Sequence, residues 1–398
     1  PPMSCRRQRQ MCIRDRVALD WEDMSRGPCS PDDADRGCLY VGDIGDNYAL
    51  RPWIVVYRLR IPDISTGDAE TRWSEVVADA HAGCLAPRYD AGLGPPQPMT
   101  HARRDIYEGK GYLPLSLLQF GRGCRFHCEY CAVGSYFDHD HHTRPVDDVV
   151  AEIQGGTRRD LFFVDDNLIA DHEAAKLLLR ALIPLQVRWV SQASIDQVED
   201  PELMRLMVES GCLGNVIGFE SLDEANLEQM GKQPNLARRD RYAAAIDTLA
   251  GHHLQTWAAF VLGYDHDTPD SLLEQCEWAI EQHFTFAAWN VLMPYPGTPL
   301  YERLAEQDRL LYDGRWWLHP DYRFNSAAFR PARMTADQLT EAAWACRQRW
   351  SSLSSIVRRA LDRSTNMSSL TRFALYLIYN PLFRREAFKR QGLRLGTR

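Results

Sequence analysis

The stretch that decides the fold reads Phe120-Gly121-Arg122-Gly123-Cys124-Arg125-Phe126-His127-Cys128-Glu129-Tyr130-Cys131. It follows a strand-like apolar run, 115–120, and enters through two glycines. Three cysteines spaced C-x₃-C-x₂-C bring soft thiolate ligands together, which favours zinc or an iron–sulfur cluster. A structural zinc site takes four protein ligands, and only three cysteines are local to this stretch, with His127 between them. Three thiolates on a cubane leave one iron open to a non-protein ligand.

Further strand-like runs follow the cysteines, with helical patterns between them. The six runs cover 115–120, 160–165, 187–193, 214–219, 255–262 and 286–293. The patterns between them predict helices over 146–154, 171–182, 200–210, 236–250 and 269–282. Repeated β/α units predict a parallel sheet with crossover helices. In barrel-like α/β folds the active residues gather at the carboxyl ends of the strands, where the cysteines lie.

The cysteine-containing stretch resembles the signature of the radical S-adenosylmethionine (SAM) superfamily, C-x₃-C-x-aromatic-C. The resemblance implies an α/β fold, a partial (β/α)₆ TIM-like barrel of the radical SAM type with a helical C-terminal extension. It also implies that Cys124, Cys128 and Cys131 hold a [4Fe–4S] cluster whose open iron binds SAM, and that Tyr130 lies near the adenine. In that family one electron from the cluster cleaves SAM to methionine and a 5′-deoxyadenosyl radical, which abstracts hydrogen from a substrate.

Asp165, Asp166 and Asn167 end the second strand-like run. An acidic strand end is commonly a helix cap, but Asp171 already serves the next helix. By the resemblance, the family contacts the SAM amino group at this strand end, and the Asp-Asp-Asn form is that of its cobalamin-associated branch. We therefore expect these three residues to bind SAM or substrate.

The next three strand ends carry further candidates for SAM binding. Ser191 and Gln192 close the third strand, where they either hydrogen-bond the SAM carboxylate or simply begin a loop. Glu220 ends the fourth strand, and a buried glutamate is costly unless paired. The resemblance places Glu220 near the SAM ribose and amino acid; a structural ion pair is the alternative. Gly263 ends the fifth strand and would allow the close backbone approach that suits an adenine-binding edge.

The sixth strand is followed by a Pro-x-Pro-Gly-Thr-Pro turn, 294–299. This turn resembles the branch of the family shared by methylthiotransferases and cobalamin-dependent members. The Asp-x-His-x-x-Gly motif of a cobalamin-binding domain does not occur in the sequence. Either the protein works without cobalamin, or its cobalamin domain is missing from a truncated, chimeric gene; we favour the second interpretation.

The sequence suggests four segments: a doubtful N-terminal segment at 1–67, a linker at 68–110, a radical SAM core at 111–330 and a helical, basic C-terminal region at 331–398. Residues 11–16 resemble translated sequencing-adapter read-through, with a plain basic tail as the alternative. Residues 17–64 resemble a β-propeller blade fragment or a β-hairpin extension. We interpret the linker as the remnant of a region that follows a cobalamin-binding domain.

Composition narrows the class of protein. Eleven cysteines, an odd number, form a poor disulfide framework and indicate a reducing compartment, which predicts a cytoplasmic location. The net charge of −8 gives no general case for nucleic-acid binding. The C-terminal residues 347–398 nevertheless hold 12 Lys and Arg against two acids. The apolar pattern at 370–383 either packs on the barrel or forms an interfacial helix that touches anionic lipid.

These observations together predict a radical SAM enzyme that methylates or rearranges an unactivated carbon. Its predicted cofactors are a [4Fe–4S] cluster and SAM, and its predicted partners are a small-molecule or lipid-like substrate and a reductant such as flavodoxin or ferredoxin. Two alternatives remain: a tRNA methylthiotransferase, which needs a second set of cluster cysteines, and a non-catalytic zinc or iron–sulfur binding module.

Overall fold

The computed structural model describes residues 115–394, the backbone of three N-terminal strands and single residues between 75 and 94. The chain divides into two units, Pro1–Leu113 and Pro114–Arg398. In the first unit, three strands pair antiparallel in the order β1-β2-β3. They are β1 (Asp23–Pro28), β2 (Gly37–Asp43) and β3 (Val55–Arg60). The tail at 1–16 and most of the linker at 68–110 lie outside the described residues, and the four predicted segments stay predictions.

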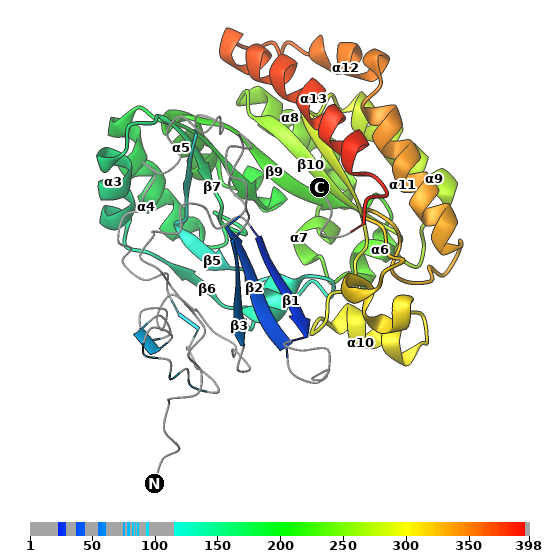
Figure 1. Ribbon diagram of the computed structural model, residues 1–398. Coiled ribbons are helices and arrows are strands. Elements are labelled where there is room, and N and C mark those ends of the chain that lie inside the picture. The colour runs from blue at the N-terminus through cyan, green and yellow to red at the C-terminus, as the bar shows by residue number, and fades with distance from the viewer. Residues whose placement is uncertain are drawn as a thin grey trace. The chain divides into compact units, whose positions relative to one another are not determined.

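The second unit is built on a six-stranded sheet in the order β4-β7-β8-β9-β10-β11 (Figure 1). The strands are β4 (Ser116–Leu118), β7 (Asp160–Phe163), β8 (Arg188–Ala193), β9 (Cys212–Glu220), β10 (Gln255–Leu262) and β11 (Phe286–Val291). Every neighbouring pair is parallel, and each strand lies beside the one that precedes it in this sheet along the chain. The predicted six β/α repeats and parallel sheet are confirmed.

Helices connect the strands, in positions that the sequence largely predicts. They are α3 (Val146–Gly155), α4 (His172–Leu182), α5 (Pro201–Glu209), α6 (Glu224–Gln229), α7 (Gln233–Leu236), α8 (Tyr242–Gly251), α9 (Pro269–Glu281) and α10 (Pro299–Glu306). Side-chain caps fix the start of α4, where the Asp171 carboxylate accepts a hydrogen bond from the Ala174 N–H at 3.1 Å. The single helix expected over 236–250 is wrong, because α7 ends at Leu236 and α8 begins only at Tyr242.

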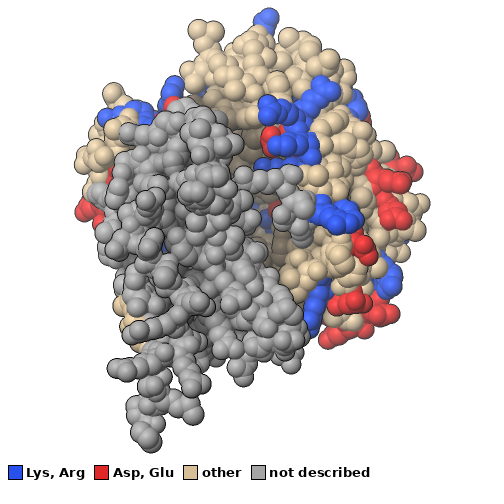
Figure 2. All heavy atoms as spheres, viewed as in Figure 1, with Lys and Arg blue, Asp and Glu red and all other residues tan. Residues whose placement is uncertain are grey.

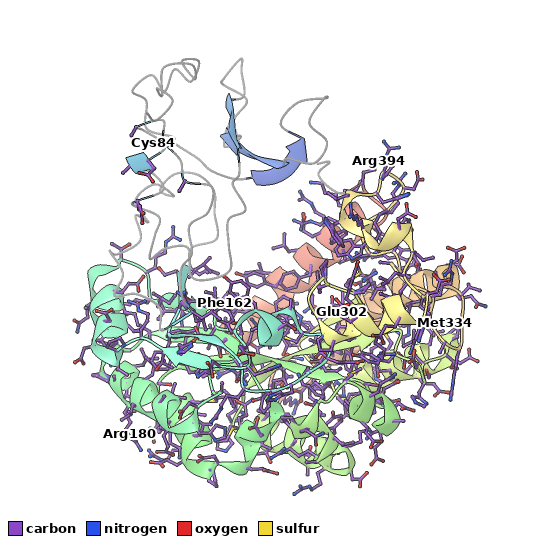
Figure 3. The ribbon with its side chains drawn as sticks, turned by 90° about the horizontal axis from the view of Figure 1, so that it is seen from below. Cys84, Phe162, Arg180, Glu302, Met334 and Arg394 are labelled. Carbon is purple, nitrogen blue, oxygen red and sulfur yellow. The ribbon has the colours of Figure 1, made fainter. Side chains whose placement is uncertain are left out.

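Helices cover one face of the sheet and give the barrel its core. Phe163 and Trp189 project from neighbouring strands and meet edge to face, with ring centroids 5.8 Å apart. The Trp189 indole N–H donates to the Ser210 carbonyl just after α5, which places this aromatic pair on the helix-covered face. Figure 3 shows Arg180 of α4 on that side, whereas Phe162 of β7 and Glu302 of α10 lie on the other side of the sheet.

A short hairpin and helix follow β4. The strands β5 (Gly121–Gly123) and β6 (His141–Thr143) pair antiparallel, and α2 (Ala132–Tyr136) lies between them in the chain. The hairpin therefore holds both ends of the segment that contains the three cysteines.

Three C-terminal helices complete the unit: α11 (Ala336–Trp350), α12 (Leu353–Ala360) and α13 (Leu370–Arg390). The fully buried guanidinium of Arg359 joins them to the sheet. It donates to the carbonyls of Phe284 and Thr285 just before β11 and lies 3.6 Å from the ring centroid of Trp350. The predicted packing of the C-terminal helix on the barrel is confirmed for one face of α13, because Phe383 packs against Trp257 with ring centroids 4.8 Å apart.

Candidate functional site

The cysteine loop, residues 124–131, is fastened to the end of β7 by two carboxylates. The Asp165 carboxylate accepts hydrogen bonds from the N–H groups of Phe120, at 3.0 Å, and Gly121. Asp166 accepts one from the Gly123 N–H at 3.0 Å. Burial raises the pKa of Asp165 to about 7, although these N–H groups favour the charged form. Both aspartates therefore position the chain that enters the loop.

Three free thiols project from this loop. The Cys128 residue is only 6% exposed, and Cys124 and Cys131 are half-buried. Burial raises the pKa of Cys128 to about 11 and also raises that of Cys124, while the positive charge of Lys232 opposes both shifts. The negative charges of Cys131 and Cys124 also raise the pKa of Cys128.

The donor set fits an iron–sulfur cluster better than a zinc ion. In the part of the chain that the structure describes, no three His, Cys, Asp or Glu side chains, the three thiols included, lie close enough together to hold a metal ion, so the comparison rests on the chemistry of the donor set. The nearby imidazole of His127 is exposed and stacks on His139, with ring centroids 3.9 Å apart. Three thiols without a fourth protein ligand match a cubane that keeps one iron open, whereas structural zinc takes four protein ligands.

A buried ion pair lies beside the thiols, between Glu220 and Lys232. The Lys232 ammonium is 2.9 Å from the Glu220 carboxylate, and the two side chains are 15% and 7% exposed. Burial lowers the pKa of Lys232, but the negative charges of Glu220 and Cys128 outweigh it and raise that pKa above its usual value. The predicted alternative for Glu220, a structural ion pair, is therefore present at the site itself. Sequence reasoning missed Lys232, which belongs to no recognisable motif.

A β-bulge turns Glu220 toward this lysine. In the β9–β10 ladder, Gly218 pairs with Ala259 and Glu220 with Phe260, so that Phe219 is skipped. Glu220 adopts a φ of +64°, which is uncommon outside glycine. A Cβ added at Gly218 would lie 2.0 Å from the Glu220 carboxylate oxygen. Only glycine at position 218 leaves room for the ion pair.

Tyr130 joins the ion pair to the cysteine loop. Burial raises the pKa of Tyr130 well above its usual value, and the negative charge of Glu220, to which its side chain hydrogen-bonds, raises it further. The Tyr130 ring also meets Tyr264 edge to face, with ring centroids 6.3 Å apart. The structure therefore brings Tyr130, Glu220 and the thiols together.

Asn167 links two strand ends to a thiol. Its amide N–H donates to the Ser194 hydroxyl at 3.0 Å, and its carbonyl accepts from the Ser194 N–H at 3.2 Å. Its side chain also hydrogen-bonds Cys124. Side chains alternate along β8, so Ser191 shares the helix-covered face with Trp189 and hydrogen-bonds Asn215 within the sheet.

Gln192 points to the opposite face of β8, where its amide donates to the Asp165 carbonyl at 3.1 Å. It therefore supports the strand end that holds the cysteine loop. Gly263 adopts a φ of +111°, and a Cβ there would meet the Leu339 side chain of α11 at 2.5 Å. The close approach that Gly263 permits is thus to a helix of the same unit.

Comparison with known proteins identifies this arrangement. The profile of the Radical SAM superfamily matches residues 118–279, the part that carries the cysteine loop, the strand ends and the ion pair. Residues 118–279 form a radical SAM domain. The family's cofactors are a [4Fe–4S] cluster and SAM, as the resemblance of the cysteine-containing stretch implies.

Relatives of this radical SAM chain include named methyltransferases. Bacteriochlorophyllide d C-12(1)-methyltransferase of Chlorobaculum tepidum is 27% identical over 294 residues, 71% of this chain and 63% of that protein. An uncharacterized methyltransferase of Synechocystis sp. is 31% identical over 255 residues, 61% of this chain and 46% of that protein. The structure of the radical SAM methyltransferase TsrM from Kitasatospora setae, with cobalamin and a [4Fe–4S] cluster bound, aligns with a TM-score of 0.42 and 19% identity, over 51% of this chain and 41% of that one.

The radical SAM chain thus spans about half to three fifths of the length of the two curated relatives. Within its described residues, no helix combines the length and apolar character needed to cross a membrane.

Proposed function

We propose that this chain is a radical SAM methyltransferase that modifies an unactivated carbon of a small molecule, with its cluster held by Cys124, Cys128 and Cys131. The observation that carries the proposal is the set of three free, partly buried thiols beside the Glu220–Lys232 ion pair. When bound, the cluster would supply the electron that cleaves SAM, and SAM would supply the radical that abstracts hydrogen from an unreactive C–H bond.

The chain's own residues have distinct proposed roles. Lys232 supplies the positive charge that offsets the thiolates, which favours the charged form that binds iron. Glu220 orients Lys232 and accepts a hydrogen bond from the Tyr130 hydroxyl. We propose Glu220 and Tyr130 as SAM contacts. Asn167 adds a hydrogen bond to Cys124.

The remaining predicted cofactor-binding residues support this centre. Asp165 and Asp166 hold the loop entry by hydrogen bonds to backbone N–H groups, and Gln192 holds Asp165. We propose these three as positioning residues. Ser191 and Gly263 stay predicted SAM contacts, although each has a structural partner within the barrel.

Methylation is favoured over the two alternatives. Two relatives are named methyltransferases, and neither is named a methylthiotransferase. A methylthiotransferase would need a second set of cluster cysteines before the loop, and Cys29, Cys38 and Cys84 are not spaced like such a set. Dependence on cobalamin is part of the proposal, and the Pro-x-Pro-Gly-Thr-Pro turn at 294–299 supports it, although the sequence contains no recognisable cobalamin-binding motif.

Anaerobic cluster reconstitution tests the assignment. The wild-type chain should bind about four iron and four sulfide ions per chain, as a [4Fe–4S] cluster requires. With dithionite and SAM it should form 5′-deoxyadenosine or a SAM-derived methyl product. The triple variant C124A/C128A/C131A should lose iron binding, whereas the control Cys84→Ala, at an exposed free cysteine, should keep it. Iron retained by the triple variant would place the ligands elsewhere. A bound cluster that yields neither product would contradict the catalytic proposal.

We also propose a cytoplasmic enzyme that touches anionic membranes through α12. Leu353 and Val357 of this helix and Leu361, the residue that follows it, recur every four residues and are 70%, 58% and 66% exposed. Arg358 and Arg363 flank this apolar stripe and are exposed. An exposed apolar stripe beside cations is the pattern of a helix that lies in the lipid interface.

Vesicle flotation tests the membrane contact. The full chain should float with phosphatidylglycerol vesicles and not with phosphatidylcholine vesicles. The variant V357S/L361S should stay unbound, while Val208→Ser, at an apolar residue of α5 that is 42% exposed, should float like the wild type. Equal flotation of all three proteins, or none with anionic vesicles, would refute the contact.

A further inference from the structure

A cavity of about 410 Å³ lies between the edge strand β11 and the C-terminal half of α13. Its volume falls in the range of small-molecule sites, roughly 300–1,000 Å³. Phe324 and Asn325 contribute to its lining from the segment before α11. No residue of the cysteine loop and neither member of the Glu220–Lys232 pair lines it. The cavity is therefore a feature of the C-terminal region rather than of the proposed cluster site.

One wall of this cavity is aromatic. The rings of Trp257, Phe286 and Phe383 pack together, with centroids 4.8 Å apart between Trp257 and Phe383 and 5.2 Å between Phe286 and Phe383. Trp289 and Trp350 line the cavity as well. A wall of this kind presents large apolar faces with little rotational freedom, on which the body of an apolar or aromatic ligand can pack.

The other side of the cavity is cationic. Arg347 is only 8% exposed, and its guanidinium donates to neutral acceptors, the Trp289 carbonyl and the Gln391 side chain. Burial lowers the pKa of Arg347 to about 10, which reflects a charge held with little compensation. Arg384 is half-buried in the same lining. Within residues 115–394, no carboxylate forms an ion pair with either arginine.

The single acid in the lining does not balance these charges. Glu386 lies 3.4 Å from Arg390, its own neighbour one helical turn away, which leaves Arg347 and Arg384 without a counter-charge in the cavity. Lys and Arg side chains also gather near α13 on the face drawn in Figure 2. A buried guanidinium without an anion costs free energy, and an anionic group entering the cavity would remove that cost.

We propose that this cavity is a binding site for an anionic amphiphile. The ligand has an apolar or aromatic body that packs on Trp257, Phe286 and Phe383, and an acid group that pairs with Arg384 at the rim and with Arg347 deeper in the lining. The shared chemistry is an anion on an apolar body, as in a fatty acid, an aromatic carboxylate or a lipid phosphate. Binding at this cavity requires neither the cluster nor SAM. A failed binding test would therefore not bear on the proposed methyltransferase activity.

Two fluorescent probes that share one ring system test the site. Anilinonaphthalene sulfonate carries the anion, and N-phenylnaphthylamine has a closely similar aromatic body without it. The full chain should bind the sulfonate more tightly than the neutral probe. Arg384→Gln should weaken sulfonate binding about tenfold, the loss expected for one charge-assisted contact, and leave the neutral probe unaffected. The matched control is Arg385→Gln, which removes the same charge from the next, exposed residue of α13 outside the cavity lining.

A second variant locates the probes. Ala387 lines the cavity from α13, and Ala387→Phe should narrow the cavity and weaken binding of both probes while the thermal unfolding midpoint stays near that of the wild type. Equal affinity for the two probes in the wild type, equal losses in the Arg384 and Arg385 variants, or undiminished binding by a folded Ala387→Phe protein would each overturn the proposal. Competition by a fatty acid, by an aromatic carboxylate or by a soluble lipid phosphate then distinguishes the sources of the anion.

Discussion

Replacement of Gly218 by alanine should break the ion pair beside the thiols. The new methyl group would lie 2.0 Å from the Glu220 carboxylate oxygen and 3.2 Å from the Lys232 ammonium, so the carboxylate must move. In the wild type this carboxylate lies 2.9 Å from the Lys232 ammonium, and the side chains of Glu220 and Lys232 are 7% and 15% exposed. Removal of one partner of a buried ion pair costs about 3–5 kcal/mol, which is the upper bound for a pair whose charges are pushed apart but both remain. Urea unfolding of the apo protein should register that loss, and iron uptake on reconstitution should fall with it.

Two controls separate this mechanism from a general effect of alanine. Gly251→Ala in α8 meets no atom within 4 Å, so it should leave stability unchanged or raise it by about 0.5–1 kcal/mol. In a Glu220→Ala background the methyl group at position 218 has no carboxylate to displace, and Gly218→Ala should then cost about 1 kcal/mol or less. A loss below about 1 kcal/mol in the wild-type background, or the same loss in both backgrounds, would refute the steric reasoning.

Three further outcomes follow from buried polar groups. Burial raises the pKa of Asp267 from 3.8 to about 6. Because the folded state then binds the proton more tightly, the free energy of unfolding should fall by about 3 kcal/mol between about pH 4 and pH 6, and Asp267→Asn should flatten that decline in urea titrations. Arg359→Met should lower stability by about 3 kcal/mol or more in the same assay, because it strips hydrogen bonds from the carbonyls of Phe284 and Thr285; a loss under 1 kcal/mol would contradict that role. Tyr264→Phe should leave stability unchanged or raise it by about 1 kcal/mol, because this buried hydroxyl has no hydrogen-bond partner among residues 115–394; a clear loss by thermal unfolding would reveal one.

The six strands were predictable because each is a short apolar run between helical patterns, and local pattern is enough for that. Segments whose structure depends on tertiary contacts were not. The break between α7 and α8 has no glycine or proline of its own, and the Asn235 amide holds it by donating to the carbonyls of Gly218 and Phe219. Helix α13 passes through Pro381 and continues to Arg390, beyond the apolar pattern at 370–383. A proline would normally interrupt a helix there.

The candidate site was predictable only where it is local in sequence. The three cysteines lie within one loop, and their spacing alone indicates a metal- or cluster-binding site. Lys232 lies about 100 residues later in the chain, and only the folding of β9 and α6 brings it to the thiols. For Gly263 the residue itself was identified from the sequence, but what it contacts was not. Its positive φ could be inferred from residue type, but whether a ligand or Leu339 approaches it depends on where α11 packs.

The strand order of the sheet has a consequence for how the chain matures. Because each strand of the six-stranded sheet pairs with the one before it, the sheet can grow one strand and helix at a time as the polypeptide leaves the ribosome. The cysteine loop emerges just after β4, the first strand of the sheet, whereas Glu220 and Lys232 emerge with and just after β9, the fourth strand. Until then the thiols have neither their cation nor the wall that buries them. Cluster insertion should therefore follow synthesis of the segment that contains Lys232, and nascent chains stopped before it would bind iron weakly.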